Sequence, residues 1–301
     1  FMLTREQIEF YENNGYLMVE DAIEPAQLLK LQQVTQEFIE KSREYAENND
    51  LFDLDDGHSQ DSPRLTRIKQ PHIQHDLYWQ TLVSDRMTGL LKAQLGPDIR
   101  LHNSKLNTKA PGGGAAVEWH QDWAFYPHTN DDLLALGIML NDVGMENGPL
   151  MVIPGSHKGE VLDHSVDGVF SGAIDPSDPA FALDKAIPLT GRAGSMTIHH
   201  VRTQHGSAPN MSDQDRMILF YECGAADAWS LGGNASAYTG ISAQEYWQFM
   251  SDRLICGEQT LMPRMESVPV RMPLPPPPDN SSIFKVQKSS GAKSAFATEG
   301  V

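Results

Sequence analysis

From about residue 98 onward, short apolar segments alternate with turn-forming residues, and this pattern places the tightest limit on the fold. The apolar segments cover residues 99–108, 135–140, 150–153, 195–199 and 217–223. Glycine, proline, asparagine and aspartate separate them, as at residues 111–114, 147–149 and 154–156. Many short strands at such spacing form a sandwich, barrel or jelly roll. We therefore predict a mainly β core over residues 98–225.

The first 97 residues carry helical patterns instead. Thr4-Arg5-Glu6-Gln7 is a capping box, which predicts a short helix that ends near Gly15 and leads into a strand over residues 16–19. Apolar residues at helical spacing predict two longer helices, over residues 25–47 and 77–95. Residues 48–66 are acidic and polar with little periodicity, so a surface loop is expected there.

The C-terminal residues 226–301 are predicted to be an extension of the same domain. Their proline-rich segment, residues 273–278, favours either a stiff extended stretch or a tail that follows the surface. The sequence contains no internal repeat. We expect a single domain over residues 1–301, with helices in 1–97 packed on a β core over 98–225 and the extension following it.

Charge and cysteine content exclude several classes of function. Forty acidic residues against 23 basic ones give a net charge of -17, which disfavours nucleic acid and anionic membrane surfaces as partners. The two cysteines, Cys223 and Cys256, fit a reducing compartment. With no signal-peptide pattern and no apolar run of membrane-spanning length, we expect a cytoplasmic protein with a small-molecule partner. The sequence carries no signal for an oligomeric state.

A pair of metal-ligating residue types occurs in Trp119-His120-Gln121-Asp122. In an extended strand, residues two positions apart point to the same face, so His120 and Asp122 should project together. One more histidine would complete a set of two histidines and one carboxylate, which binds non-haem Fe(II) and leaves positions open for other ligands. A His-x-Asp pair by itself is more often a solvated surface pair.

His205 is the candidate for the third ligand. Arg216 follows eleven positions later and can grip a carboxylate bidentately, as a dicarboxylate co-substrate would require. We expect His205 and Arg216 on neighbouring antiparallel strands, with Ser207 adding a hydroxyl donor. His199 and His200 are competitors, but neither has an arginine eleven residues further on. Packing or hydrogen bonding on a strand is the simpler role for these two, although one of them can still line a substrate pocket.

Residues 119–157 and 205–216 together resemble the phytanoyl-CoA dioxygenase family. The resemblance covers about residues 4–225 and implies a double-stranded β-helix (jelly-roll) core that uses Fe(II), 2-oxoglutarate and O2. It implies that His120, Asp122 and His205 ligate the metal, and that Arg216 and Ser207 hold the distal carboxylate of 2-oxoglutarate. The segment His102-Asn103-Ser104-Lys105 matches a family segment that contributes polar groups to co-substrate and substrate. Asn103 and Lys105 are therefore further candidates for binding 2-oxoglutarate. Relatives often carry glutamine where Asn103 stands.

Substrate contacts are expected from two other groups of residues. The segment after the metal motif lies over the pocket in the resembled family, which suggests Trp123, Tyr126 and His128; core packing explains these side chains equally well. A basic cluster in this acidic chain suggests that Arg67 and Lys69 bind an anionic group of the substrate, unless local acids neutralise them. His200 completes the set of substrate candidates.

The resulting prediction is a 2-oxoglutarate-dependent dioxygenase that hydroxylates an unactivated C–H bond of a small metabolite, releasing succinate and CO2. Arg67 and Lys69 suggest that this metabolite carries an anionic group. Asp122 favours this chemistry over halogenation, because related halogenases lack the carboxylate. The same cofactors support desaturation, epoxidation or cyclisation in natural-product biosynthesis, which is the first alternative. The second is a non-catalytic jelly-roll binding protein.

Overall fold

Strand pairing divides the β core into two facing antiparallel sheets. The computed structural model describes residues 2–113, 116–232, 240–280 and 282–296. The large sheet has the order β1 (Tyr16–Val19), β11 (Met196–His200), β6 (Leu133–Met139), β13 (Arg216–Ala225), β4 (Ile99–Lys109), β3 (Leu65–Lys69) and β2 (Phe52–Leu54), and β14 (Leu254–Cys256) also pairs with β4. The small sheet has the order β10 (Ile187–Leu189), β7 (Leu150–Val152), β12 (His205–Ser207) and β5 (Val117–His120). A hairpin of β8 (Ser165–Val166) and β9 (Val169–Phe170) stands apart. The predicted mainly β, jelly-roll class is confirmed.

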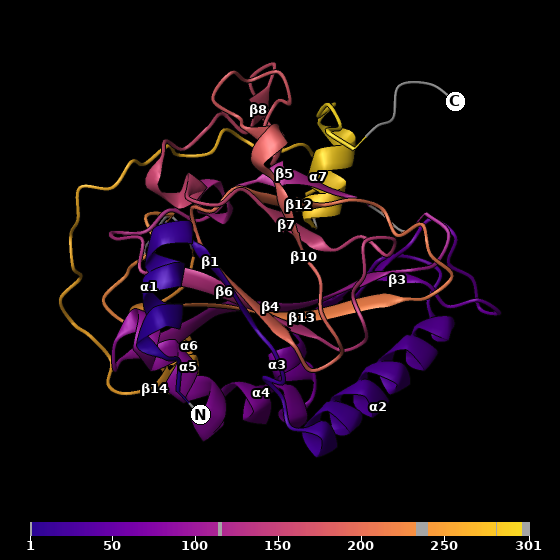
Figure 1. Cartoon of the computed structure of the whole chain (residues 1–301), viewed down its shortest axis with the longest axis horizontal. Coiled ribbons are helices and arrows are strands. Elements are labelled where there is room, and N and C mark those ends of the chain that lie inside the picture. Colours follow the sequence, from indigo (N-terminus) through magenta and orange to yellow (C-terminus); the bar gives the residue numbers. More distant parts are fainter. Residues whose placement is uncertain (1, 114–115, 233–239, 281, 297–301) are drawn as a thin grey trace.

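Helices cover the face of the large sheet that points away from the small one (Figure 1). The capping box at Thr4 is present, and Gly15 ends α1 (Arg5–Asn14) with a positive φ of 74°. The helix predicted over residues 25–47 is shorter, as α2 (Pro25–Lys41) followed by a 3-10 turn at Ser42–Glu44. A short α3 (Pro71–Gln74) precedes the helix predicted over 77–95. That helix is two, α4 (Asp76–Leu82) and α5 (Asp85–Leu95), because the Ser84 side chain caps a new helix start by accepting from the Met87 N–H.

The first third of the chain is less purely helical than predicted. It supplies β1, β2 and β3 to the large sheet, and both β2 and the first residues of β3 fall in the range expected to be a surface loop. The loop prediction failed because Phe52 and Leu65 are buried in the main core while acidic residues surround them in sequence. Local composition therefore masked two short strands, of which β3 pairs with β4 and β2 pairs with β3.

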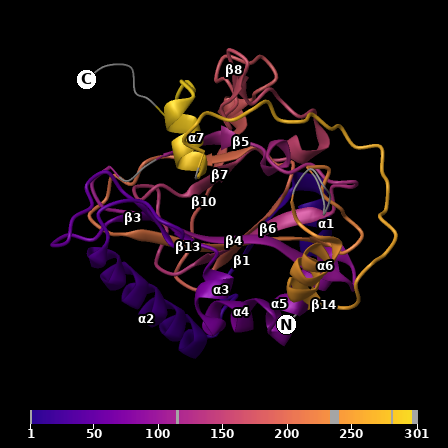
Figure 2. The ribbon, with the colours of Figure 1, turned by 180° about the vertical axis from the view of Figure 1, so that it is seen from behind.

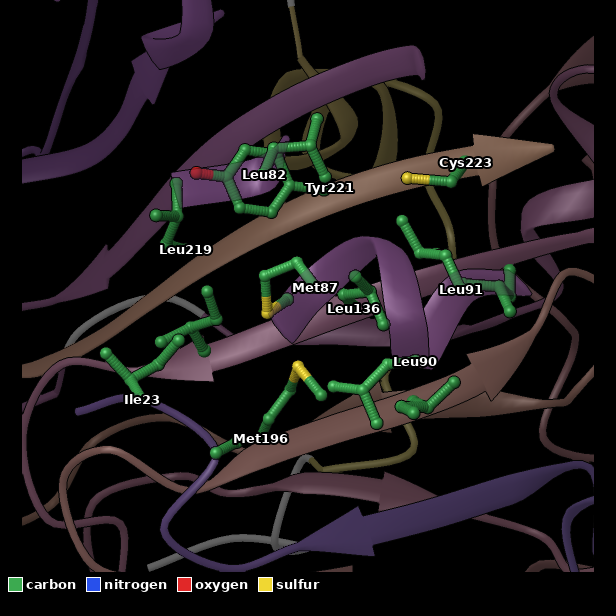
Figure 3. Close-up of a cluster of buried hydrophobic side chains, with 14 of the residues drawn as sticks. Ile23, Leu82, Met87, Leu90, Leu91, Leu136, Met196, Leu219, Tyr221 and Cys223 are labelled. Atoms are coloured by element: carbon green, nitrogen blue, oxygen red, sulfur yellow. The ribbon is translucent and has the colours of Figure 1, made fainter. Parts of the chain in front are cut away.

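The main hydrophobic core lies between the large sheet and α4 and α5. Figure 3 shows Met87, Leu90 and Leu91 packed against side chains of β6, β11 and β13. On β13, Leu219 and Tyr221 face this core, and the Tyr221 hydroxyl donates to the Tyr78 carbonyl at 2.6 Å. Because successive residues of a strand point to opposite faces, the intervening positions on β13 face the small sheet. The core thereby sets which side chains enter the space between the sheets.

The C-terminal extension returns to the small sheet. After α6 (Ala243–Asp252) and β14, the chain runs along the outside of the molecule and then forms α7 (Ile283–Ser289), which lies beside β5 (Figures 1 and 2). Hydrogen bonds tie the extended part down: Trp123 Nε1–H donates to the Pro269 carbonyl at 2.7 Å, and the Phe170 N–H to the Pro275 carbonyl at 3.0 Å. The proline-rich segment thus follows the surface. None of the helices within the described residues is long and apolar enough to cross a membrane.

Candidate metal centre

Three buried side chains, from two strands of the small sheet and the turn that follows one of them, converge. His120 ends β5 and His205 begins β12, and the two are direct cross-strand partners. Asp122 opens the 3-10 turn Asp122–Ala124 that follows β5. Ligand atoms of the three residues all lie within 4.8 Å of one another, the one such group of histidine, cysteine and acidic residues found in the described residues. The Asp122 Oδ1 atom is 3.6 Å from His120 Nε2 and 3.8 Å from His205 Nε2.

His120 and Asp122 project to the same side, as the strand prediction for the His-x-Asp motif requires, although the strand itself ends at His120. Gln121 keeps extended backbone angles, φ −115° and ψ 127°, so the residues on either side of it still project together. Gln121 is itself fixed: its N–H donates to His164 Nε2 at 2.8 Å and its side-chain amide to the Arg202 carbonyl at 2.9 Å. These anchors come from distant segments and were not predicted.

The protonation states of the group suit a metal ion. The Nδ1 atom of each ligand histidine lies at hydrogen-bond distance from a backbone carbonyl. His120 Nδ1 is 2.8 Å from the Glu118 carbonyl, and His205 Nδ1 is 2.9 Å from the Thr203 carbonyl. Donation from Nδ1–H leaves the Nε2 lone pairs facing Asp122. Burial lowers the pKa of His205 well below its usual value. Burial acts to raise the pKa of Asp122, but the neighbouring imidazoles outweigh it and hold that pKa well below the ordinary value. Two imidazoles and one carboxylate match the donor set of a mononuclear iron site.

His199 is a fourth imidazole in the same place, with a different contact. Its Nε2 lies 3.4 Å from Asp122 Oδ2, the oxygen other than the one nearest His120 and His205. Its ring centre is 4.3 Å from that of His205, and neither ring nitrogen has a hydrogen-bond partner among the described residues. His199 therefore lies against the carboxylate and lines the pocket at the triad. The available sequence signal was the alternation of side chains along β11, the strand that pairs with β6, because every second residue of a strand points to the same face.

His200, in contrast, does not face this space. It is the next residue along β11, so its side chain lies on the opposite face of the sheet. Its Nδ1 accepts from the Arg202 N–H at 3.1 Å, and its ring packs 5.2 Å from His157. Burial lowers the pKa of His200 to about 3. The substrate role predicted for His200 is not supported, because the pleat turns it away from the site.

A pocket of about 490 Å³ between the two sheets holds the triad, and we call it the triad pocket. Its walls include the triad itself and Lys105, Asn107, His199, Ser207, Arg216, Phe220 and Ile283. His205 and Arg216 were expected on neighbouring strands, and this is wrong: β12 belongs to the small sheet and β13 to the large one. Residues 208–215 cross from one sheet to the other, so the two side chains enter the pocket from opposite walls.

The Arg216 end of the pocket is cationic and buried. Arg216 is 2% exposed, and its Nε and Nη1 have no hydrogen-bond partner among the described residues. Burial lowers the pKa of Arg216 to about 9. Opposite it on β4 stands Lys109, whose Nζ donates to Ser207 Oγ at 2.8 Å, to the Ser207 carbonyl at 3.1 Å and to the Ala208 carbonyl. A buried guanidinium with unused N–H groups is suited to a carboxylate ligand.

The β4 side chains divide differently from the prediction. Lys105 lines the pocket and forms an ion pair of 2.5 Å with Glu222. Asn103, two residues earlier, is not among the lining residues, whereas Asn107, two residues later, is. Asn107 accepts from Arg67 Nε–H at 3.1 Å. The alternation of polar residues along β4, at Asn103, Lys105 and Asn107, is the sequence signal that points to Asn107.

The remaining substrate candidates separate into near and distant groups. Lys69 is paired with Asp53 at 3.0 Å and does not line the triad pocket. Trp123 is fully buried in a separate apolar cluster, so core packing explains it. Tyr126 lies nearer the site: burial raises its pKa well above the usual value, and the Asp122 carboxylate adds to the rise. His128 Nδ1 is 2.7 Å from the Tyr126 carbonyl.

Comparisons with known proteins agree on one group of enzymes. The sequence model of the family described as Phytanoyl-CoA dioxygenase (PhyH) matches residues 11–218. The chain is 38% identical over 290 residues to a probable alpha-ketoglutarate-dependent hypophosphite dioxygenase of Stutzerimonas stutzeri, covering 94% of this chain and 97% of the relative. It is 25% identical over 239 residues to an ectoine dioxygenase of Stutzerimonas stutzeri strain A1501, covering 73% and 76%. The crystal structure of EctD from S. alaskensis with bound Fe is similar with a TM-score of 0.63 at 22% identity, covering 74% of this chain and 77% of that one.

Proposed function

Because the chain belongs to the phytanoyl-CoA dioxygenase family, whose members here are iron- and 2-oxoglutarate-dependent oxygenases, we propose that it oxidises a small anionic substrate. The reaction consumes O2 and 2-oxoglutarate. One oxygen atom enters the substrate by replacing R–H with R–OH, and the other enters succinate as CO2 leaves. The family relationship supports the cofactors and the reaction class, while the substrate class is the part that this proposal adds.

Within this proposal, His120, Asp122 and His205 hold Fe(II). Two observations support the assignment. The ligand atoms of the three residues lie close to one another, and Nδ1 of both histidines is at hydrogen-bond distance from a backbone carbonyl. When bound, iron and 2-oxoglutarate together supply the oxidising chemistry that side chains lack. His199 contacts the Asp122 oxygen that is not nearest the two ligand histidines, so it positions that carboxylate.

Arg216 and Ser207 are proposed to bind the distal carboxylate of 2-oxoglutarate. The unused N–H groups of Arg216 support this role. Lys109 donates to Ser207 Oγ, which leaves the hydroxyl proton of Ser207 free to be donated into the pocket. Ile283 of α7 forms part of the wall on the other side and limits the access of water to the reacting groups.

The main support for an anionic substrate is an excess of buried positive charge. Three cationic side chains, Arg67, Lys105 and Arg216, line or adjoin the triad pocket against two carboxylates, Asp122 and Glu222. Lys109 is not counted, because burial and the charge of Arg216 lower the pKa of its ammonium group well below the usual value. The charges of Fe(II) and of the 2-oxoglutarate dianion cancel, so a net charge near +1 remains for the substrate. This excess lies inside a chain whose net charge is -17. A buried cation without a counter-ion is costly, and an anionic substrate relieves that cost.

The relative from Stutzerimonas stutzeri supports the same class, since its printed name specifies hypophosphite, a small oxyanion. A direct test measures succinate release by the iron-loaded enzyme with two sets of compounds. The anionic set is hypophosphite, methylphosphonate, propylphosphonate and butyrate; the control set is ectoine and L-proline. We expect turnover above the substrate-free rate in the anionic set only, and none with His120→Ala. Turnover confined to the control set would contradict the proposal, and no coupled turnover with an intact iron site would favour a binding protein.

The mass of the product distinguishes hydroxylation from the alternative outcomes. Insertion of one oxygen atom adds 16 mass units to the substrate in the reaction proposed above. Loss of two hydrogen atoms would instead indicate desaturation or cyclisation with the same cofactors.

A further inference from the structure

The interior of the β core continues past the triad in the direction away from Arg216. Along β13, alternate residues point inward: Arg216 and Phe220 line the triad pocket, Glu222 pairs with the pocket residue Lys105, and Gly224 lines a second cavity. If 2-oxoglutarate extends from Arg216 to the triad, as proposed above, it fills one side of the pocket. A substrate must then approach from the side of Glu222 and Gly224.

That second cavity lies beneath α6, and we call it the α6 cavity. It has a volume of about 710 Å³ and is bounded by β4, β13 and α6. Its polar lining includes Arg100, His102, His128, Tyr246 and Arg253. A bulge in β4, where Asn103 and Leu101 pair with consecutive residues of β13, brings His102 to the cavity beside Arg100.

Tyr126 contacts a side chain that lines the α6 cavity and lies near Asp122. Its ring centre is 4.2 Å from that of His102, which is in turn 5.3 Å from that of His128. At its other side, Tyr126 is close enough to Asp122 and Glu222 for both carboxylates to affect the pKa of its hydroxyl. An aromatic side chain in contact with the lining of the α6 cavity thus also lies close to the metal motif.

The α6 cavity is cationic and contains no acid among its described lining residues. Arg100 is 5% exposed and Arg253 is 9% exposed. Arg100 donates to the Gln259 side chain at 3.1 Å and to backbone carbonyls of Ala226 and Ala228. Arg253 donates to the His102 carbonyl at 3.0 Å and stacks on Phe249 at 4.1 Å. Neither arginine forms an ion pair with a carboxylate in the part of the chain that the structure describes.

We propose that the α6 cavity binds the anionic group of the substrate through Arg253 and Arg100, while the substrate's oxidised C–H bond reaches the iron past Tyr126. The inference rests on the proposed function and narrows it. The substrate is an organic anion, a phosphonate or a carboxylate, with a carbon chain long enough to span both cavities. Hypophosphite has no such chain and cannot occupy both places at once.

A chain-length series tests this assignment. The measured quantity is the ratio of kcat/KM for pentylphosphonate to kcat/KM for methylphosphonate, in the wild type, in Arg253→Met and in Arg253→Lys. We expect a strong preference for the longer anion in the wild type. Loss of one charge-assisted contact should reduce that preference about tenfold to hundredfold in Arg253→Met, with partial recovery in Arg253→Lys. The exposed Arg271, which pairs with Asp163 outside the cavity, provides the control Arg271→Met, which should keep the wild-type ratio.

Two further measurements separate this inference from folding effects and from the proposed function. Met250→Trp leaves both arginines in place but fills the cavity, so it should also reduce the preference for the longer anion. Calorimetric binding of pentylphosphonate to protein without iron or 2-oxoglutarate should weaken in Arg253→Met and not in Arg271→Met. A wild-type ratio in both Arg253→Met and Met250→Trp, with turnover of anions retained, would overturn the inference and leave the proposed function intact. Failure of every anion as a substrate would instead refute the proposed function.

Discussion

Replacing Arg216 with methionine should stabilise the protein and at the same time abolish its affinity for 2-oxoglutarate. Arg216 is buried, makes no ion pair in the described residues, and leaves two of its nitrogens without hydrogen-bond partners. Methionine has a similar length and no charge, so it removes the buried cation without opening a large cavity. The same side chain that binds the co-substrate is therefore a cost to the folded protein in its absence.

The pKa of Arg216 gives the magnitude. Burial lowers it from 12.5 to about 9, and each unit corresponds to about 1.4 kcal/mol. At pH 7 the guanidinium is charged in both states, so the full cost falls on the folded state; it disappears only as the pH rises from 9 toward 12.5. The difference of about 3.5 units between these two pKa values therefore corresponds to about 5 kcal/mol, and we expect Arg216→Met to raise the free energy of unfolding by about that amount. Two lost charge-assisted hydrogen bonds should weaken 2-oxoglutarate binding by about two to four orders of magnitude.

Urea unfolding with and without 2-oxoglutarate, under anaerobic conditions with Fe(II), measures both effects. The wild type should gain stability when 2-oxoglutarate is added, and Arg216→Met should not. The matched control is Arg202→Met, since Arg202 is also buried but pairs with Asp131 at 2.7 Å. Breaking that pair should destabilise the protein by about 3–5 kcal/mol and keep the response to 2-oxoglutarate. The reasoning is refuted if Arg216→Met is less stable than the wild type without ligand, or if it still responds to 2-oxoglutarate.

Three further predictions concern groups around the site. Lys109→Met should raise the KM for 2-oxoglutarate about tenfold or more by releasing Ser207, and initial rates of succinate release check this; a change in kcat with an unaltered KM would contradict it. Gln287→Ala removes the hydrogen bonds that dock α7 on Glu118 and Gly172, so amide exchange of α7 should accelerate and substrate-independent succinate release should increase; protection equal to the wild type would show that α7 is held otherwise. Burial, with the charge of Arg253, lowers the pKa of His72 to about 4, so unfolding should take up a proton and stability should fall by about 1.4 kcal/mol per unit as the pH drops from 6.5 toward 4. His72→Asn should lack that contribution to the slope of stability against pH. The control His75→Asn, at an exposed helix cap, should keep it.

Local patterns were reliable where neighbouring residues decide the structure. The capping box at Thr4 and the Gly15 stop gave α1 correctly, because both act within one helical turn. The same local logic failed between residues 48 and 95. There, β2 forms only by pairing with β3, and the cap at Ser84 divides an apolar pattern that continues across it.

The site divides in the same way. His120 and Asp122 could be paired from their spacing because extended backbone at Gln121 puts both on one side. The selection of His205 over His199 agrees with the group that the structure brings together. The same spacing argument did not reveal that His199 would lie against Asp122, because that contact joins β11 of the large sheet to the turn after β5 of the small one.

The sequence by itself determined the β class, the three candidate ligands and the candidate arginine, since strand alternation and motif spacing are properties of a few adjacent residues. Only the tertiary structure decided which polar side chains share a space with them. Lys109 and Ser207 are 98 positions apart, Ile283 arrives from the C-terminal extension, and the α6 cavity forms where a bulge in β4 meets a helix more than 140 residues later in the chain. Contacts over such separations depend on how whole sheets and helices pack, and no local pattern in the chain specifies that packing.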